Sequence, residues 1–438
     1  MPMFKRILKS YDYAFIAVFI VLCLFGLIMI YSASWSLAIG KGLPADYFYA
    51  RQVKNFIISF IFFILFALLP FKFYQNNKVL MLIVFGSIGV LLLIFLVGKT
   101  VNNANSWLVL GPRSLQPGEF AKLAVIIYMS AIYAKKQSYI DDFNRGVLPP
   151  IFFLAFVCFL IAIQPDTGTA FIIFLVGCCI IITSGMRLRT IMKLIGIGMG
   201  IIIGLTLILF ALPDSVRNEI VSPTKVARIT TFMNPFEYAD KEGHQLINSF
   251  YAIGSGGVSG QGLGESVQKL GYLPEAHTDF IIAVVAEELG VFGVMFIILA
   301  LFFIIFKTIT TGLRAKDPFA SLMCYGIASL IAIQAFINLG GASGLIPLTG
   351  VTLPFISYGG SSLMVLSMML GIVANISMFT KYQRVYKADG STKELPKKQK
   401  KDVKLCRKKL NNLAFFFFTI PHVFGVFIAS LFVFSILF

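Results

Sequence analysis

Long apolar runs recur along the sequence, and they limit the folds open to it more than any other feature. Each run has about the 20 residues that a helix needs to cross a bilayer, and none alternates strictly as a barrel strand does. Because backbone N–H and C=O groups in lipid must be paired within the protein, only helices or closed barrels span membranes. The sequence therefore predicts an all-α polytopic membrane protein with about ten transmembrane helices. We expect these helices near residues 13–33, 53–70, 78–98, 119–134, 148–163, 167–186, 190–212, 280–306, 319–338 and 357–380.

The basic residues indicate how these helices are oriented. They give the chain of 438 residues a formal net charge of +17, which in a soluble protein would suggest a nucleic-acid partner. Here, however, lysine and arginine recur in alternate short loops, as is typical of cytoplasmic loops. We therefore expect a multi-pass protein of the cell membrane, with a cytoplasmic N-terminus and no nucleic-acid partner. The first apolar run lacks a convincing cleavage site, so we expect it to remain as a signal anchor.

Three parts of the chain differ in composition. Residues 1–385 hold the apolar runs, with a large extracellular loop at about 213–279 between the seventh and eighth spans. Because this loop is apolar in places, we expect short helices in it, on the membrane surface. Residues 386–412 form a basic cytoplasmic tail that would contact anionic lipid. Residues 413–438 form an apolar C-terminal segment that is long enough for an extra span.

The segment from Gly271 to Gly293 is the place where charge meets the membrane. It begins as a polar loop and becomes apolar after Asp279, which therefore lies at a membrane boundary. The simplest interpretation is that Thr278 or Asp279 caps the following helix. Capping does not explain why Glu287 and Glu288 follow inside the apolar run. Carboxylates near hydrocarbon are costly and usually serve a function or a cation partner, so we predict a functional role for Asp279.

Three further polar islands lie on the same predicted side, at residues 102–122, 164–169 and 338–362. Glycine and proline interrupt the last one, so it cannot be a single regular helix. Irregular backbone at membrane depth is tolerated only where protein buries it or where it lines a wet cavity. With the Asp279 segment, these islands predict an outward-facing cavity. The glycine-rich run at 254–264 could approach a phosphate, but a flexible turn is the simpler interpretation because no nucleotide-binding motif accompanies it.

Individual residues of the islands admit two interpretations. Lys122 and Glu119 are three residues apart at a loop-to-helix junction, so a structural ion pair is the plain interpretation and binding of an anionic headgroup is the alternative. Trp107 could be an interfacial belt residue or a substrate contact. Asp166 could simply cap the helix that follows it.

Several of these segments together resemble one family. They are HTDF at 277–280, EELG at 287–290, LPFISYGGSS at 353–362, QPD at 164–166 and SLQPGEFAK at 114–122, and they resemble motifs of the SEDS family of bacterial envelope proteins. The similarity covers about residues 11–385, so that residues 1–385 would be a SEDS-type transmembrane domain. It is greatest to division-type members from Gram-positive bacteria, with the elongation type as the near alternative. The apolar segment at 413–438 departs from the family.

The resemblance implies a peptidoglycan glycosyltransferase that polymerises lipid II into glycan strands during septal wall synthesis. It also implies a class B penicillin-binding protein as the transpeptidase partner, beside other divisome membrane proteins. By motif position, Asp279 matches the essential acidic residue of the family, and Trp107, Lys122, Ser357 and Ser361 match positions that we interpret as substrate-binding. A lipid II flippase and a non-catalytic division scaffold are the alternatives, although a flippase should have a polar path at the bilayer centre.

The implied reaction needs a base and a counter-charge for the leaving group. A sugar hydroxyl attacks the anomeric carbon of the next donor and displaces undecaprenyl pyrophosphate. Asp279 is the candidate base, and His277 is a competing base with an ordinary pKa nearer neutrality. Lys122, Arg113 and Arg228 are the cations available for the pyrophosphate. A divalent cation, magnesium or manganese, could assist them, and no other cofactor is expected.

Overall fold

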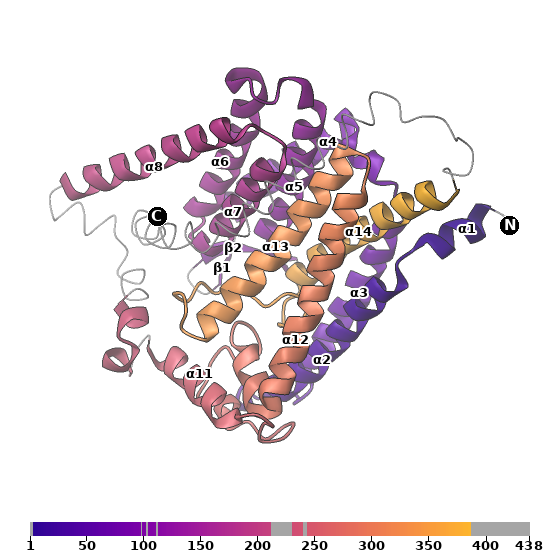
Figure 1. Ribbon diagram of the computed structural model, residues 1–438. Helices are drawn as coiled ribbons and strands as arrows, with labels where there is room; N and C mark the ends of the chain where they lie inside the picture. The colour runs from indigo at the N-terminus through magenta and orange to yellow at the C-terminus, as the bar shows by residue number, and fades with distance from the viewer. Residues whose placement is uncertain are drawn as a thin grey trace.

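A computed structural model describes residues 3–97, 99–101, 104–110, 113–211, 230–239 and 243–386, and these residues form a bundle of long helices (Figure 1). In this part of the chain, ten long helices lie over the ten predicted spans. They are α2 (Tyr13–Gly40), α3 (Tyr47–Leu68), α4 (Asn77–Val97), α5 (Pro117–Lys135), α6 (Leu148–Ile163), α7 (Thr167–Thr183), α8 (Leu188–Ala211), α12 (Ile281–Arg314), α13 (Pro318–Ala342) and α14 (Gly360–Tyr386).

Shorter elements connect the long helices. Helix α11 lies within the predicted large loop, which confirms that this loop contains helical structure. The short helices are α1 (Met3–Ser10), η1 (Phe71–Gln75), η2 (Gln137–Tyr139), η3 (Phe143–Val147), η4 (Pro235–Tyr238), α11 (Gly243–Gly256) and η5 (Gln268–Leu270). The strands are β1 (Lys99–Val101), β2 (Ala104–Leu110) and β3 (Arg113–Leu115).

The membrane class of the protein follows from these helices. Among the described residues, seven helices are long and apolar enough to cross a membrane by length and composition. They are α2, α3, α4, the continuous helix formed by η3 and α6 (Phe143–Ile163), α12, α13 and α14. Helix α7 is apolar but shorter, with 17 residues. The chain is therefore a helical multi-pass membrane protein, as the sequence predicts.

Helices α13 and α14 form the centre of the bundle. In the most apolar window of each, 78% of the residues are buried, against 17% in α4, which leaves most of α4 for lipid. Because lipid is as apolar as a leucine side chain, helices in a membrane associate mainly through close packing of small residues. Gly371 of α14 lies directly against the backbone of α3 at Phe63, and Gly26 of α2 lies against Phe355.

Several helices extend past their apolar runs. Helix α2 continues to Gly40 and α12 continues to Arg314, whereas the predicted spans end at residues 33 and 306. An apolar window detects only the part of a helix that lies in hydrocarbon. Its hydrogen-bonded ends continue into the interface, where polar residues are tolerated.

A small antiparallel sheet between α4 and α5 is not predicted by the sequence analysis, which treats residues 102–122 as a loop leading into a helix. Strand β2 pairs with β1, with Lys99 opposite Trp107, and with β3, with Leu110 opposite Arg113. The signal is present but short: Trp107 to Leu110 is a β-prone run, and the turn-prone pair Gly111 and Pro112 follows it. The membrane-spanning part remains all-helical.

The basic tail at 386–412, apart from Tyr386, and the apolar segment at 413–438 lie outside the described residues. Their predicted structures therefore stay predictions. Most of the first part of the large loop, at 212–229, lies outside them as well.

Candidate functional site

Asp279 lies in a tight turn immediately before α12. The turn is closed by backbone hydrogen bonds from Thr278 and Phe280 to the carbonyl of Glu275, both 3.2 Å long. The prediction that Thr278 or Asp279 caps the helix is wrong, because Phe280 occupies the N-cap position and makes no side-chain cap. Instead, the Thr278 hydroxyl donates to the Glu275 carboxylate. Asp279 is half-buried, and its Oδ2 would lie 3.6 Å from a Cβ atom at Gly350.

The 338–362 island holds this turn in place. The Asn338 side chain donates to the carbonyl oxygens of both Asp279, at 2.7 Å, and Val351, at 2.8 Å. The Ser357 hydroxyl donates to the Thr278 carbonyl at 2.6 Å. Next to it, the Tyr358 N–H donates to the His277 carbonyl at 2.9 Å. The backbone on either side of Asp279 is thus fixed by α13 and by the segment that enters α14.

The other two islands join at the same end of the bundle, which we call the polar end. The backbone N–H of Gln116, just before α5, donates to the Ser361 hydroxyl of α14 at 3.1 Å. The Gln116 side chain donates to Asp166 at 2.7 Å. Asp166 also caps α7, as predicted, by accepting from the Thr169 N–H at 3.1 Å. All four islands therefore meet where α5, α7, α12 and α14 begin.

Lys122 and Glu119 form a buried ion pair in the first turns of α5. The Lys122 Nζ lies 2.7 Å from Glu119 Oε1, and the two side chains are 2% and 7% exposed. The predicted neighbour relationship is therefore confirmed. Among the described residues, Glu119 is the one hydrogen-bond acceptor of the Lys122 ammonium group. An ammonium group has three N–H donors, so this cation can bind a further anionic ligand without losing its partner.

His277 is buried beside two aromatic rings. Its ring centroid lies 4.8 Å from that of Phe48 and 5.5 Å from that of Tyr358. Burial, helped by the charge of Lys41, lowers the pKa of His277 to about 4. The expectation of a base with a pKa near neutrality is therefore wrong for this residue, because the site removes the imidazole from water. Its Nδ1 has no hydrogen-bond partner within the described part of the chain.

Three predicted site residues cannot be compared with the prediction at the level of their side chains. The backbone of Trp107 lies in β2 and that of Arg113 lies in β3, but the described structure does not extend to their side chains. Arg228 lies outside the described residues. The described residues contain no group of three or more His, Cys, Asp or Glu side chains that could hold a metal ion. A magnesium ion bound mainly by a pyrophosphate needs only one or two carboxylates, so this finding leaves the metal prediction open.

Sequence reasoning missed two polar residues that fix the site. Asn338 is the first residue of the 338–362 island and is buried, and its sequence signal is an amide at the edge of an apolar run. Lys269 is buried to 2% exposure and pairs with Glu288 at 2.7 Å. Its partner lies 19 residues away, so no helical spacing links the two residues.

Comparisons with known proteins point to one family. The family model described as cell cycle protein, which covers FtsW, RodA and SpoVE, matches residues 12–382. The chain is 50% identical over 381 residues to the probable peptidoglycan glycosyltransferase FtsW of Bacillus subtilis, covering 87% of this chain and 94% of that protein. It is 38% identical over 375 residues to the stage V sporulation protein E of the same organism, covering 85% and 98%.

Solved structures show the same fold. A chain from the study of structural coordination of polymerization and crosslinking by a peptidoglycan synthase complex matches with a TM-score of 0.69 at 23% identity, covering 84% of this chain and 98% of that one. The rod shape determining protein RodA of Thermus thermophilus matches with a TM-score of 0.58 at 24% identity, covering 84% and 96%. At these identities the likeness concerns the fold.

Proposed function

Because this chain belongs to the cell cycle protein family of FtsW, RodA and SpoVE, we propose that it is a peptidoglycan glycosyltransferase that polymerises lipid II. The relative with 50% identity is named a probable peptidoglycan glycosyltransferase, and the match covers 87% of this chain and 94% of that protein. The site that would carry the reaction is the polar end of the bundle.

One observation supports this function more than any other. Four segments that are distant in the sequence converge at the polar end, and the hydrogen bonds from Asn338 and Ser357 fix the backbone around Asp279. A carboxylate that protein contacts hold at a membrane boundary suits a reaction between groups carried by membrane lipids. A non-catalytic scaffold would not need this arrangement.

The reaction is a single displacement. The C4 hydroxyl oxygen of the acceptor sugar attacks the anomeric carbon of the donor, Asp279 takes the hydroxyl proton, and the bond to the lipid pyrophosphate breaks with its electron pair. One base is enough, because the displacement forms no covalent enzyme intermediate. Lys122 would balance the charge on the leaving pyrophosphate with its remaining N–H donors, together with Arg113 and Arg228. Trp107 and Ser361 would contact the substrate, whereas Ser357 and His277 would shape the loop around it.

A divalent cation is the remaining component that we propose to test. Magnesium or manganese would supply positive charge at the pyrophosphate when bound. The carboxylate of Asp279 or Asp166 would be a further ligand of the ion. We route no proton transfer through it. Removal of divalent ions with EDTA should slow polymerisation if the cation takes part.

The orientation and partners follow from the same proposal. We place the polar end at the outer face of the cell membrane, with the N-terminus in the cytoplasm, because the alternate short loops are basic. The division septum is the proposed location, since this chain is 50% identical to the FtsW protein of Bacillus subtilis. A class B penicillin-binding protein is the proposed partner, beside other divisome membrane proteins. The solved peptidoglycan synthase complex supports a partner of this general kind.

The direct test uses purified full-length chain, with and without the penicillin-binding protein, and lipid II labelled on its stem peptide. The wild-type chain should form glycan polymer, whereas Asp279→Asn should form none while remaining folded, because asparagine keeps the shape and loses the base. The matched control is Asp317→Asn, which changes an aspartate that caps α13 at the other end of the bundle. Asparagine can still cap, so this control should retain activity. Polymer from Asp279→Asn at the wild-type rate would refute the role of Asp279.

A further inference from the structure

Helix α12 is interrupted at Gly290, two residues beyond the second of its two adjacent glutamates. Gly290 has φ 62° and ψ −155°, a left-handed backbone conformation that favours glycine. The N–H of Val291, which would donate to the Glu287 carbonyl in a continuous helix, donates to the Val258 carbonyl at 3.1 Å instead. The interruption leaves a short helix, residues 281–289, that follows directly after Asp279. Asp279 is thus attached to an element that is separate from the long membrane-spanning part of α12.

The glycine-rich loop replaces the helical hydrogen bonds lost at this break. The Gln261 N–H donates to the Glu287 carbonyl at 2.9 Å, and the Gly262 N–H donates to the Glu288 carbonyl at 3.0 Å. A Cβ atom at Gly260 would overlap the Glu288 backbone, so a side chain at that position would separate the loop from the helix. The flexible turn predicted for this run is therefore a packed loop, held against the end of the short helix.

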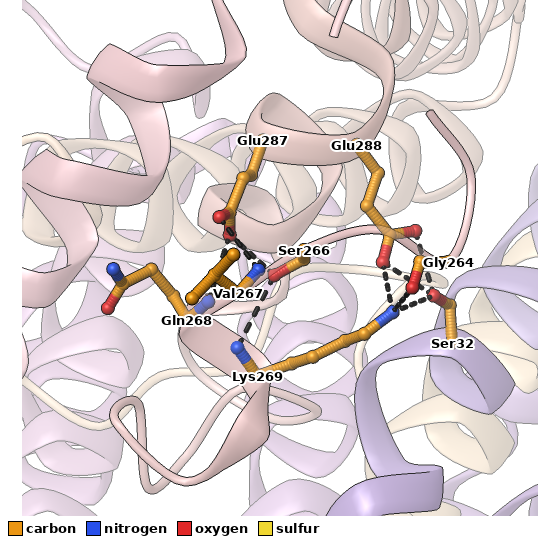
Figure 2. A network of polar contacts seen from close by, with 8 residues as sticks. All are labelled: Ser32, Gly264, Ser266, Val267, Gln268, Lys269, Glu287 and Glu288. Carbon is orange, nitrogen blue, oxygen red and sulfur yellow. Dashed lines mark hydrogen bonds and ion pairs between the residues drawn. The ribbon is translucent and has the colours of Figure 1, made fainter. Parts of the chain in front are cut away.

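The Glu287 side chain fixes the next part of the loop (Figure 2). Its carboxylate accepts hydrogen bonds from the Ser266 hydroxyl and from the backbone N–H groups of Val267, at 2.9 Å, and Gln268, at 3.4 Å. These N–H groups lie at the start of η5, where backbone donors have no partner within the helix. Glu287 therefore satisfies the donors of this turn and attaches η5 to the short helix.

Lys269 and Glu288 form the second connection, and Ser32 of α2 completes it (Figure 2). The Lys269 ammonium group donates to Glu288 at 2.7 Å, to Ser32 at 3.1 Å and to the Gly264 carbonyl at 2.6 Å. Its three N–H donors thus have three acceptors. The two charged side chains are 1% and 0% exposed. The Ser32 hydroxyl also lies 2.6 Å from Glu288, so the pair joins the loop, the short helix and α2.

A buried ion pair of this kind gives little net stability. The free energy lost by removing two charges from water is about as large as the free energy gained from their attraction. A protein with well-packed apolar residues in place of such a pair is often equally stable. The pair instead fixes the position of the loop, because the three acceptors around the Lys269 ammonium group can be reached together from only one loop position. The chain then leaves this position at Lys269 and returns to the same short helix at Ile281, and the intervening loop carries Asp279.

We propose that Lys269 and Glu288 are positioning residues for the reaction at Asp279: by anchoring the loop and the short helix to α2, they hold the Asp279 carboxylate where it meets the acceptor hydroxyl. This inference rests on the proposed glycosyltransferase function. Its prediction is specific to catalysis, because Lys122, which we propose to bind the substrate, lies in α5 and pairs with Glu119, not with the residues of this anchor. Loss of the anchor should therefore lower kcat and leave KM for lipid II near its wild-type value.

The test compares Lys269→Met, Glu288→Gln and the double variant with a control pair, Lys307→Met with Asp12→Asn. The control removes another ion pair, at 2.9 Å, that joins α12 to the start of α2 at the opposite end of the bundle. Each single variant leaves one buried charge without its partner and should unfold more readily. The double variant leaves no lone charge, so it should regain thermal stability, yet its kcat should remain reduced by about 10-fold to 100-fold. The control should keep its kcat.

Two further measurements separate the possible outcomes. Spin labels at Tyr272 in the loop and Tyr49 in α3, which are 54% and 36% exposed, measure the distance between the two elements. This measurement does not depend on enzymatic activity. That distance should broaden in the double variant and stay narrow in the control. If the single variants fail to fold, Ser32→Ala, which leaves the ion pair in place, should lower kcat less than the double variant does. Recovery of kcat with stability in the double variant, or an unchanged label distance, would overturn the proposal. Absence of polymer from the wild-type chain would instead overturn the proposed function, whatever the labels show.

Discussion

At the scale of single residues, the two buried lysines of the polar end differ in how many acceptors they have. Lys269 and Lys122 each lie 2.7 Å from a glutamate, and each is almost fully buried. Lys269 has three acceptors, whereas Lys122 has one among the described residues. A buried ammonium group with unused donors is costly, and a bound anion removes that cost. We therefore keep Lys122 as the proposed cation for the substrate, and we assign Lys269 to the scaffold.

This difference predicts that Lys122 and Glu119 are not equivalent in catalysis. If Lys122 binds the pyrophosphate, Lys122→Met should reduce polymerisation strongly, and adding Glu119→Gln should not restore it. If the lysine only balanced Glu119, the double variant should recover, because a lone buried charge costs roughly 3 to 5 kcal/mol while loss of both partners can be nearly neutral. A double-mutant cycle on lipid II turnover, normalised to folded protein, measures this difference. Recovery in the double variant would leave Arg113 and Arg228 as the phosphate ligands.

The low pKa of His277 predicts a particular dependence on pH. With a folded-state pKa of about 4 and an ordinary value of 6.5, the unfolded chain binds a proton at this residue between these pH values and the folded chain does not. The free energy of unfolding should therefore fall as the pH falls through this window, and His277 should contribute nothing to the pH dependence above it. His277→Gln should reduce the loss of thermal stability between about pH 6.5 and about pH 4. An equal loss in both proteins would show that His277 titrates normally.

The same pKa makes His277 a weak candidate for the catalytic base. It stays neutral across the physiological range, so the pH profile of polymerisation should keep its shape in His277→Gln even if the rate changes. If His277→Gln instead removed the fall in polymerisation rate on one side of the pH optimum, His277 would be the catalytic base.

At the scale of elements, close helix contacts at small residues hold the site's framework together. Helix α14 begins at the polar end with Gly360 and Ser361, and its later turns pack on α3. A Cβ atom at Gly371 would lie 2.5 Å from the Phe63 carbonyl oxygen, inside the contact distance of two atoms. Since membrane helices associate through this kind of packing, the spacing of α3 and α14 depends on the absence of a side chain there.

Gly371→Ala should therefore lower the free energy of unfolding of the detergent-solubilised protein by about 1 to 3 kcal/mol, as is typical of overpacking. The measurement is the melting temperature. Gly86→Ala in α4 is the matched control, because a Cβ atom at that position has no neighbour within 4 Å. In the control, alanine's higher helix propensity should leave stability unchanged or slightly higher. Equal melting temperatures for the two variants would show that α14 can shift away from α3 without cost.

At the scale of the whole molecule, the basic short loops and the proposed active site lie at opposite ends of the bundle. The loops that carry Lys136 and Lys316 are at one end, and the four islands are at the other. From the positive-inside rule we expect the polar end to face outward, which is the side on which peptidoglycan is polymerised in our proposal.

This orientation can be measured by cysteine labelling in intact cells. Single cysteines at Ser255 and Gly111 should react with an impermeant maleimide added outside, and those at Lys136 and Lys316 should react only after the membrane is opened. Ser255 and Lys316 are exposed, so accessibility does not limit the reaction. The background needs Cys406→Ser only, because the other five cysteines lie in helices within the bundle. Labelling of Ser255→Cys from the cytoplasm alone would invert the topology.

The sequence by itself determined the class of the protein, the positions of its ten long helices and the place of Asp279 directly before the eighth of them. These features depend on local composition: an apolar run long enough to span a bilayer must be a helix, wherever it packs. The adjacent pair Lys122 and Glu119 was predictable for the same reason, since helical spacing alone makes them neighbours.

Only the tertiary structure decided how Asp279 is held and which charges are partners. The Asn338 and Ser357 contacts, the sheet before α5 and the joining of Lys269 with Glu288 and Ser32 all link segments whose separation follows no helical period. The break at Gly290 is likewise invisible in a continuous apolar run, because it forms only when another loop supplies the lost backbone hydrogen bonds. Such contacts depend on where the chain returns after long excursions, and local composition does not specify that return.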